Sequence, residues 1–167
     1  MRIAIGNDHA GFPLKGHVVD FVRELGHEVV DVGTQDESPV DFPIMTRRVT
    51  ELVNAGTVSR GLLVCGTGVG AAIAANKVPG IRAAVIHDTY VARQGVEHDD
   101  VNVACLGAWV IGRRIAEEVI REYLAATFST DPDFRRRVAQ LAEMDGSLGS
   151  RPEGSVARGE VPQIGTA

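Results

Sequence analysis

Short apolar runs alternate with longer amphipathic segments along most of this chain. The apolar runs are too brief for helices, and in the longer segments the apolar residues recur at helical spacing. The expected strands are 2–6, 27–32, 60–64, 81–86 and 101–106, and the expected helices are 11–25, 43–55, 71–77, 88–97 and 111–126. A last helix is expected after Asp131, a capping residue followed by Pro132, and it should reach about Met144.

This alternation predicts an α/β fold. Strands joined through helices form right-handed crossovers, which give a parallel sheet covered by helices on both faces. We therefore expect a Rossmann-like three-layer sandwich around a five-stranded parallel sheet. Ligands of such sheets bind outside the carboxyl ends of the strands. Here those ends carry residues 7–9, 65–70, 87–88 and 107–109.

Length and composition narrow the class of protein. The 167 residues, 44% of them hydrophobic, suit a single domain over residues 1–145. Residues 146–167 are rich in Gly, Ser and Pro, which predicts a disordered tail. A net charge of −5 argues against nucleic-acid and membrane-surface partners and favours a small molecule. The two cysteines lack metal-ligand spacing, and a reducing cytoplasm is the expected location.

The most distinctive segment is 62–70, where an apolar strand ends in Cys65 and continues into Gly66, Gly68 and Gly70. Glycines can turn successive backbone N–H groups toward one point, and the following helix adds its positive end, so this loop should hold an anion. The same field predicts a lowered pKa for Cys65. A nicotinamide site is disfavoured because its glycine fingerprint belongs in the first strand-to-helix turn, here residues 7–11.

Four segments together resemble the ribose-5-phosphate isomerase B family, which includes the galactose-6-phosphate isomerase subunits. They are Gly-Asn-Asp-His-Ala-Gly at 6–11, Cys-Gly-Thr-Gly-Val-Gly at 65–70, residues 74–82, and Glu-His at 97–98. The resemblance covers residues 1 to 145. It implies an aldose–ketose isomerase without cofactor or metal, a homodimer or dimer of dimers with active sites at the subunit interface, and a C-terminal helix that extends to a partner.

The resemblance also assigns roles. Moving a carbonyl between two sugar carbons needs a base for a carbon-bound proton, donors for the enediolate oxygen and a group that opens the ring. Cys65 would be the base, Thr67 would assist the backbone anion hole, and His98 would open the ring. The expected substrate-binding residues are Asp8, His9, Gly66, Gly68, Val69, Gly70, Asp99, Trp109, Asp133 and Arg137. The remaining histidines, His17, His27 and His87, are assigned no functional role.

The chain departs from the family where a phosphate would bind. Trp109 stands where phosphate-binding members carry an arginine, and Asp133 and Phe134 replace an Arg-His pair, so that Arg137 alone remains. A carboxylate would repel phosphate unless it were paired, and Asp133 is spaced to pair with Arg137. Alternatively, Arg113, Arg114 or Arg136 replaces the lost arginines. Two further changes fall in the expected sugar pocket, Asp99 for an asparagine and Phe42 for a tyrosine.

Three functions remain open at this point. The first is interconversion of D-ribose 5-phosphate and D-ribulose 5-phosphate through an enediolate. The second is the same chemistry on a different or non-phosphorylated sugar, with Trp109 stacking on the sugar face. The third is a sugar- or anion-binding module without catalysis, which the presence of Cys65, Thr67 and His98 disfavours.

Overall fold

The computed structural model describes residues 1–146 and contains a five-stranded, wholly parallel sheet in the order β2-β1-β3-β5-β4. The strands are β1 (Arg2–Asn7), β2 (Glu28–Asp31), β3 (Arg60–Cys65), β4 (Ala83–Val85) and β5 (Val103–Gly107). The helices are α1 (Phe12–Glu24), α2 (Phe42–Asn54), α3 (Val69–Ala75), α4 (Thr89–Asp99), α5 (Arg113–Ala125) and α6 (Pro132–Met144). All of the expected elements are therefore present, with boundaries displaced by a few residues.

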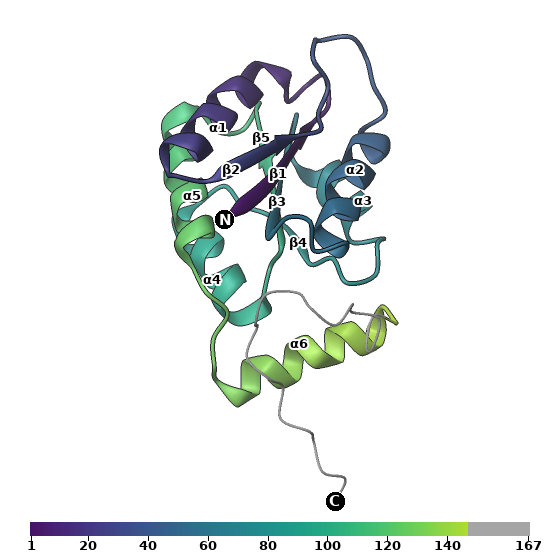
Figure 1. Ribbon diagram of the computed structural model, residues 1–167, viewed down its shortest axis with the longest axis vertical. Coiled ribbons are helices and arrows are strands. Elements are labelled where there is room, and N and C mark those ends of the chain that lie inside the picture. The colour runs from purple at the N-terminus through teal and green to yellow at the C-terminus, as the bar shows by residue number, and fades with distance from the viewer. Residues whose placement is uncertain (147–167) are drawn as a thin grey trace, which may run out of the picture.

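Two hydrophobic clusters form the two faces of the sandwich. The larger cluster joins one face of the sheet to α1, α4 and α5, and the smaller joins the other face to α2 and α3 (Figure 1). Central strand β3 contributes to both, because Leu62 and Val64 point to the first cluster and Leu63 to the second. The three-layer arrangement confirms the predicted fold class.

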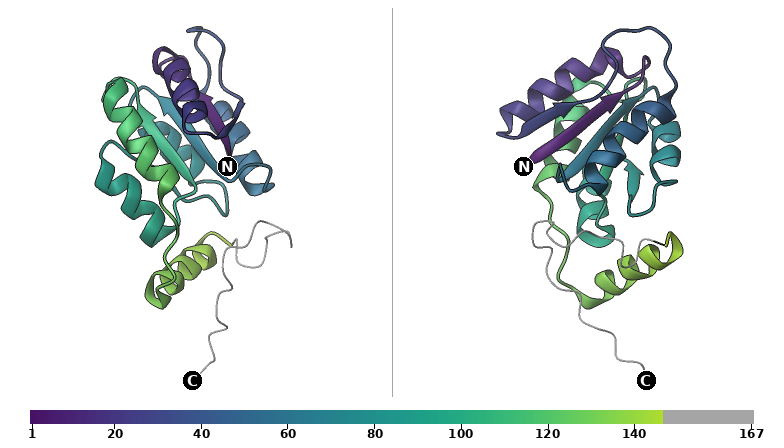
Figure 2. Two further views of the ribbon diagram at one scale, coloured as in Figure 1. Left: turned by 60° about the vertical axis from the view of Figure 1, so that its left-hand side comes forward. Right: turned by 45° about the vertical axis from the view of Figure 1, so that its right-hand side comes forward.

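Helix α6 lies outside the three layers, beyond the end of the sheet at which the strands begin (Figures 1 and 2). The Asp131 carboxylate accepts a hydrogen bond from Asp133 N, 2.8 Å away, and thereby caps its start as expected. None of its residues is buried in this chain, and its hydrophobic residues Leu141 and Met144 are exposed. The helix touches α4 of its own chain and leaves most of its surface open.

No helix within residues 1–146 is both long and apolar enough to cross a membrane. The predicted disordered tail falls on residues 147–167, outside the described residues, except for Gly146.

Candidate active site

The strand order places Asp8 next to Cys65. The chain leaves β1 toward β2 on one side and returns through β3 on the other, so the crevice at the carboxyl ends of β1 and β3 is the topological switch point. Asn7 is in register with Val64, and Asp8 N donates to Val64 O across 3.3 Å. Residues 57 positions apart in the sequence thus meet at one edge of the sheet.

The half-buried Cys65 thiol experiences opposing influences. Burial raises its pKa most, and the hydrogen bond to the Asp8 carboxylate and the negative charge of that carboxylate raise the pKa further. The backbone N–H groups of Gly68 and Gly66 lower it, but they do not outweigh the other causes. The predicted lowering of the Cys65 pKa is therefore wrong, because the glycine loop acts on a thiol that is desolvated and faces a carboxylate.

The buried Asp8 is held by the backbone around it. Its Oδ1 accepts a hydrogen bond from Gly11 N, 2.9 Å away, in the turn before α1, whose N-cap residue Gly11 has no side-chain cap. A β-carbon on Gly11 would lie 1.9 Å from Val64 O, so only glycine lets this turn approach β3. Neighbouring His9 accepts a hydrogen bond at Nδ1 from Val40 N, 3.3 Å away, which ties the loop before α2 to the same edge.

The glycine loop has the conformation expected of an anion cradle. Gly68 has φ +80°, a left-handed conformation that favours glycine, and α3 begins at Val69 directly after it. The Thr67 side chain is exposed, and its hydroxyl accepts a hydrogen bond from Val69 N across 3.3 Å. Gly66 and Gly68 are buried, and Val69 is exposed.

Two aromatic rings flank this loop. The Trp109 ring lies over Gly66, where an added β-carbon would come within 2.9 Å of it, and Trp109 N donates to Gly66 O across 2.9 Å. The Phe42 ring lies against Gly70, 3.2 Å from the position of an added β-carbon. Trp109 is nevertheless 74% exposed, so one face of the loop is bordered by a large apolar surface.

The other expected site residues form a second cluster on α4 and α6. The His98 ring stacks on Phe134 with centroids 3.9 Å apart and planes 15° apart, and its Nδ1 accepts a hydrogen bond from Gln94 Nε2 across 2.8 Å. The Arg137 guanidinium lies 5.7 Å from the centre of the Phe134 ring. Asp99, beside His98, is exposed.

Asp133 does not pair with Arg137 in this cluster. Its carboxylate oxygen Oδ1 lies 2.5 Å from Nη1 of Arg136, one turn along α6. The predicted Asp133–Arg137 pair is therefore wrong, and Arg136 neutralises the carboxylate instead. Arg137 remains beside the His98–Phe134 stack.

The two clusters lie at opposite ends of the strands, the first at their carboxyl ends and the second at their amino ends. Cys65 is in register with Gly107, the last residue of β5, whereas Asp99 O accepts a hydrogen bond from Arg82 Nε, 3.2 Å away, just before β4 begins. Helix α4 begins at the end of the sheet that carries Cys65 and runs toward the opposite end. His98 lies nine residues after Thr89, which is about 14 Å along the helix axis. Within one chain the structure brings Asp8, His9, Thr67 and Trp109 to Cys65, but not His98, Asp99, Asp133 or Arg137.

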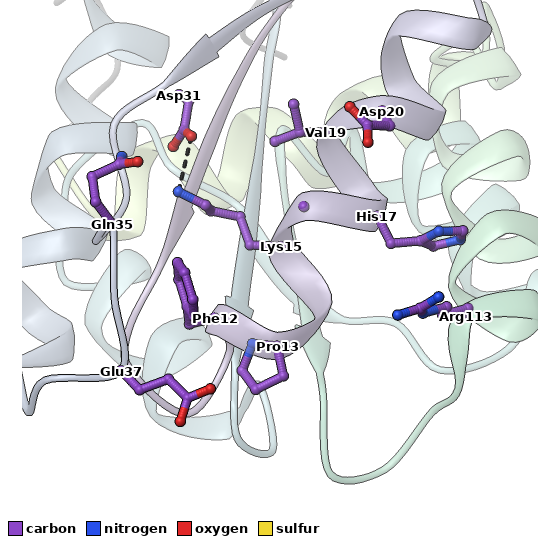
Figure 3. A pocket seen from close by; sticks show the side chains of 11 residues that line it. Phe12, Pro13, Lys15, His17, Val19, Asp20, Asp31, Gln35, Glu37 and Arg113 are labelled. Atoms are coloured by element: carbon purple, nitrogen blue, oxygen red, sulfur yellow. Dashed lines mark hydrogen bonds and ion pairs between the residues drawn. The ribbon is translucent and has the colours of Figure 1, made fainter.

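A surface hollow of about 500 Å³ lies elsewhere, between α1, the loop after β2 and Arg113 (Figure 3). Lys15 points to Asp31 there, with Nζ 2.9 Å from Oδ2, and its Nζ also donates to Thr34 O across 2.8 Å. The only charge buried in the hollow is therefore neutralised, and none of its lining residues belongs to either cluster. Residues 1–146 contain no group of three or more His, Cys, Asp or Glu side chains that could hold a metal ion.

Comparison with known proteins connects this geometry to a family. Residues 3–141 match the model of the Ribose/Galactose Isomerase family. The chain belongs to this family. It is 42% identical over 127 residues to ribose-5-phosphate isomerase B of Escherichia coli, covering 76% of this chain and 85% of that protein. It is 40% identical over 130 residues to D-erythrulose-4-phosphate isomerase of Pectobacterium atrosepticum, covering 77% and 85%.

Solved structures of the family have the same fold. Ribose-5-phosphate isomerase B of Clostridium thermocellum superposes with a TM-score of 0.85 at 42% identity and covers 89% of this chain and 100% of that one. The family resemblance is thus confirmed, and so is the class of enzyme, an aldose–ketose isomerase.

His87, assigned no role from the sequence, lies just after β4, at the same carboxyl ends of the strands as Cys65. Its Nε2 accepts a hydrogen bond from Gly107 N, 3.0 Å away, beside the backbone of Thr67. Its position after a strand, like those of Asp8 and Trp109, was the signal that could have identified it.

Proposed function

We propose that this isomerase interconverts D-ribose 5-phosphate and D-ribulose 5-phosphate, with Cys65 as the group that moves the carbon-bound proton. The observation that carries the proposal is the position of the Cys65 thiol at the switch point, between the Asp8 carboxylate and the N–H groups of Gly66 and Gly68. A base and hydrogen-bond donors for an oxyanion are thereby at one place, as an enediolate mechanism requires.

The raised pKa of Cys65 means that little of the thiol is ionised near neutral pH, and it also makes the thiolate that does form a stronger base. A thiolate that forms beside Asp8 is more basic than a free one, and it accepts the proton from C2 of the open-chain aldose. The C–H electron pair then forms the C1–C2 double bond, and the negative charge on O1 faces the loop's N–H groups. The Cys65 thiol returns the proton to C1 while the hydroxyl proton moves from O2 to O1, so the sugar is isomerised without a redox partner.

A second copy of the chain would complete this site. His98 is the ring-opening group that the family resemblance implies, and its own chain holds it about 14 Å along α4 from the Cys65 edge. The Gln94 amide contacts Nδ1 of His98, which leaves Nε2 available to a sugar oxygen. A homodimer in which α4 and α6 of one subunit approach the Cys65 loop of the other unites the two clusters. The exposed apolar residues Trp109, Leu141 and Met144 favour such an interface.

A different or non-phosphorylated sugar is the second candidate substrate. It is favoured by Trp109, whose exposed ring flanks the anion loop where phosphate-binding relatives are expected to carry an arginine. A relative at 40% identity is itself named for erythrulose 4-phosphate, so members this similar act on different sugars. Because Arg136 is paired with Asp133, Arg137 of α6 is the cation that would bind a phosphate in the first candidate.

A substrate panel separates the two candidates. The purified protein is assayed by kcat/KM on ribose 5-phosphate, erythrulose 4-phosphate and free pentoses and hexoses. Preference for ribose 5-phosphate supports the proposal, and preference for a free sugar supports the second candidate. Preference for another sugar phosphate would replace the pentose but keep the chemistry.

Restoring the missing charges tests the same point by substitution. Trp109→Arg combined with Asp133→Arg should raise kcat/KM for sugar phosphates about tenfold, because each guanidinium–phosphate contact is charge-assisted. The matched control is Trp109→Gln combined with Asp133→Asn, which removes the ring and the carboxylate without adding positive charge. Equal gains in the two proteins would show that added charge is not the cause.

We also propose a cytoplasmic location and a single isomerase domain over residues 1–145. Both cysteines are free thiols, as in a reducing compartment.

A further inference from the structure

His87 occupies the end of the short edge strand β4, close to the catalytic loop. The ladder between β4 and β5 stops at Val85 and Cys105, after which Ile86 N donates to Cys105 O across 3.0 Å. The next N–H group on this side of β5 belongs to Gly107, beyond the reach of the strand. The half-buried His87 ring supplies its acceptor, with Nε2 3.0 Å from Gly107 N. A side chain thus extends the ladder by one hydrogen bond.

Gly107 lies directly beneath the glycine loop. A β-carbon on Gly107 would lie 2.9 Å from both the carbonyl carbon and the oxygen of Thr67 and 3.0 Å from His87 Nε2. Gly107 is therefore in close contact with both the loop backbone at Thr67 and the His87 ring. A shift of this residue has to move one of the two.

The rest of the loop packs on the same strand. A β-carbon on Gly68 would lie 3.3 Å from the carbonyl group of Cys105. Cys65 is in register with Gly107, and its carbonyl oxygen accepts a hydrogen bond from Ala108 N across 2.8 Å. The thiol and its N–H donors consequently take their position from the end of β5.

We propose that His87 is a positioning residue of the isomerase: its neutral Nε2 holds Gly107, and Gly107 holds the Thr67–Gly68 backbone under Cys65. The proposal rests on the proposed function in one respect, the use of Cys65 and this loop in catalysis. A protonated imidazole carries N–H donors on both nitrogens and cannot accept from Gly107. The hydrogen bond should therefore exist only while His87 is neutral.

The surroundings of His87 favour the neutral ring. Burial lowers its pKa below the ordinary value of 6.5, and the Asp88 carboxylate opposes this by raising it. Asp88 already accepts a hydrogen bond from Val91 N, 2.8 Å away, as the cap of α4. Residues 66–70 and 106–110 contribute no acidic or basic side chain. Cys65 and Cys105 are the titratable groups toward the carboxyl ends of β3 and β5, and Arg60 lies at the opposite end of β3. The bond is thus present near neutral pH and is lost as the pH falls through the lowered pKa.

Two substitutions separate the acceptor from the ring. His87→Gln keeps an oxygen that can accept from Gly107 N and removes the titration, whereas His87→Leu keeps bulk and removes the acceptor. The control is His27→Gln, a histidine before β2 whose substitution should leave the pH profile of kcat as in the wild type. We expect at least a tenfold loss of kcat for His87→Leu. For His87→Gln we expect most of the kcat at pH 7.5 and an acidic decline displaced to lower pH.

Alkylation of Cys65 needs no sugar, so it tests the positioning role of His87 separately from the proposed function. Alkylation of Cys65 by iodoacetamide reports the thiol alone, because Cys105 is fully buried. His87→Leu should alkylate about fivefold more slowly at pH 7.5, because the N–H donors that favour the thiolate have moved, and His87→Gln should match the wild type. These alkylation rates support the positioning role even if no sugar in the panel is a substrate. The role is overturned if His87→Leu matches the wild type in kcat and alkylation. If His87→Leu does not fold, a pH profile of His87→Gln that superposes on the wild type overturns it.

Discussion

Mixing a Cys65→Ala protein with a His98→Gln protein should restore isomerase activity that neither has alone. The proposed dimer predicts this because, within one chain, the carboxyl end of β3 and the last turn of α4 lie at opposite ends of the sheet's strands. A proton-transfer group works within about 3 Å of its target, and about 14 Å of helix separates His98 from the Cys65 edge. In the proposed dimer, each active site therefore takes Cys65 from one subunit and His98 from its partner.

The size of the recovery follows from counting sites. A dimer with two-fold symmetry has two equivalent sites. In the heterodimer, one site combines Cys65 of the His98→Gln chain with His98 of the Cys65→Ala chain and is intact. The other site contains both substitutions. The purified heterodimer should have about half of the wild-type kcat per dimer, and random pairing of equal amounts should give about a quarter.

The assay uses two affinity tags on co-expressed chains, so that the heterodimer is isolated from both homodimers. The matched control combines Cys65→Ala with Asp8→Ala. These residues belong to the same cluster, so each site of that heterodimer lacks one of them and activity should stay at the homodimer level. An inactive Cys65→Ala/His98→Gln heterodimer that is folded and dimeric would refute the shared site, as would equal recovery in the control.

Two other substitutions test the local physics. Asp8→Asn should move the alkylation of Cys65 by iodoacetamide to lower pH, because it removes the carboxylate charge that raises the thiol pKa; an unchanged pH profile would show that burial alone is responsible. Asp100→Asn should destabilise the fold by about 3 kcal/mol in urea unfolding, because it removes the negative charge 2.6 Å from the Arg82 guanidinium, whose side chain is 12% exposed. Asp20→Asn, in an exposed pair, is the control and should change the free energy of unfolding by less than about 0.5 kcal/mol; equal losses would contradict this account.

Most of the fold could be predicted because local pattern and global topology agree. Helix α3, for example, follows its strand after three residues, as the alanines after Gly70 indicate, although it begins two residues before the expected start. Strand β4 is shorter than its apolar run, since its ladder with β5 covers only Ala83–Val85. That shortening leaves the Gly107 N–H to His87, a consequence of sheet pairing that the periodicity of the chain does not reveal.

The candidate site was predicted where neighbours in the sequence build it and missed where distant segments meet. Residues 65–70 could be recognised together because strand, loop and helix follow directly along the chain. The raised pKa of Cys65 depends on Asp8, which only the pairing of β1 with β3 brings to the thiol. Likewise, Asp133 had two arginines within helical reach, Arg136 and Arg137, and spacing alone did not decide between them.

The most direct test of the central claim is the exchange of solvent deuterium into the sugar, followed by NMR with the wild type and Cys65→Ala. We predict that the wild type incorporates deuterium at the two carbons between which the carbonyl moves, because the half-buried Cys65 thiol carries the proton and can exchange it with solvent. Cys65→Ala should bind the same sugar, since the anion loop is backbone, and should incorporate none above the uncatalysed rate. Deuterium incorporation by Cys65→Ala at the wild-type rate would contradict the assignment of Cys65 as the base.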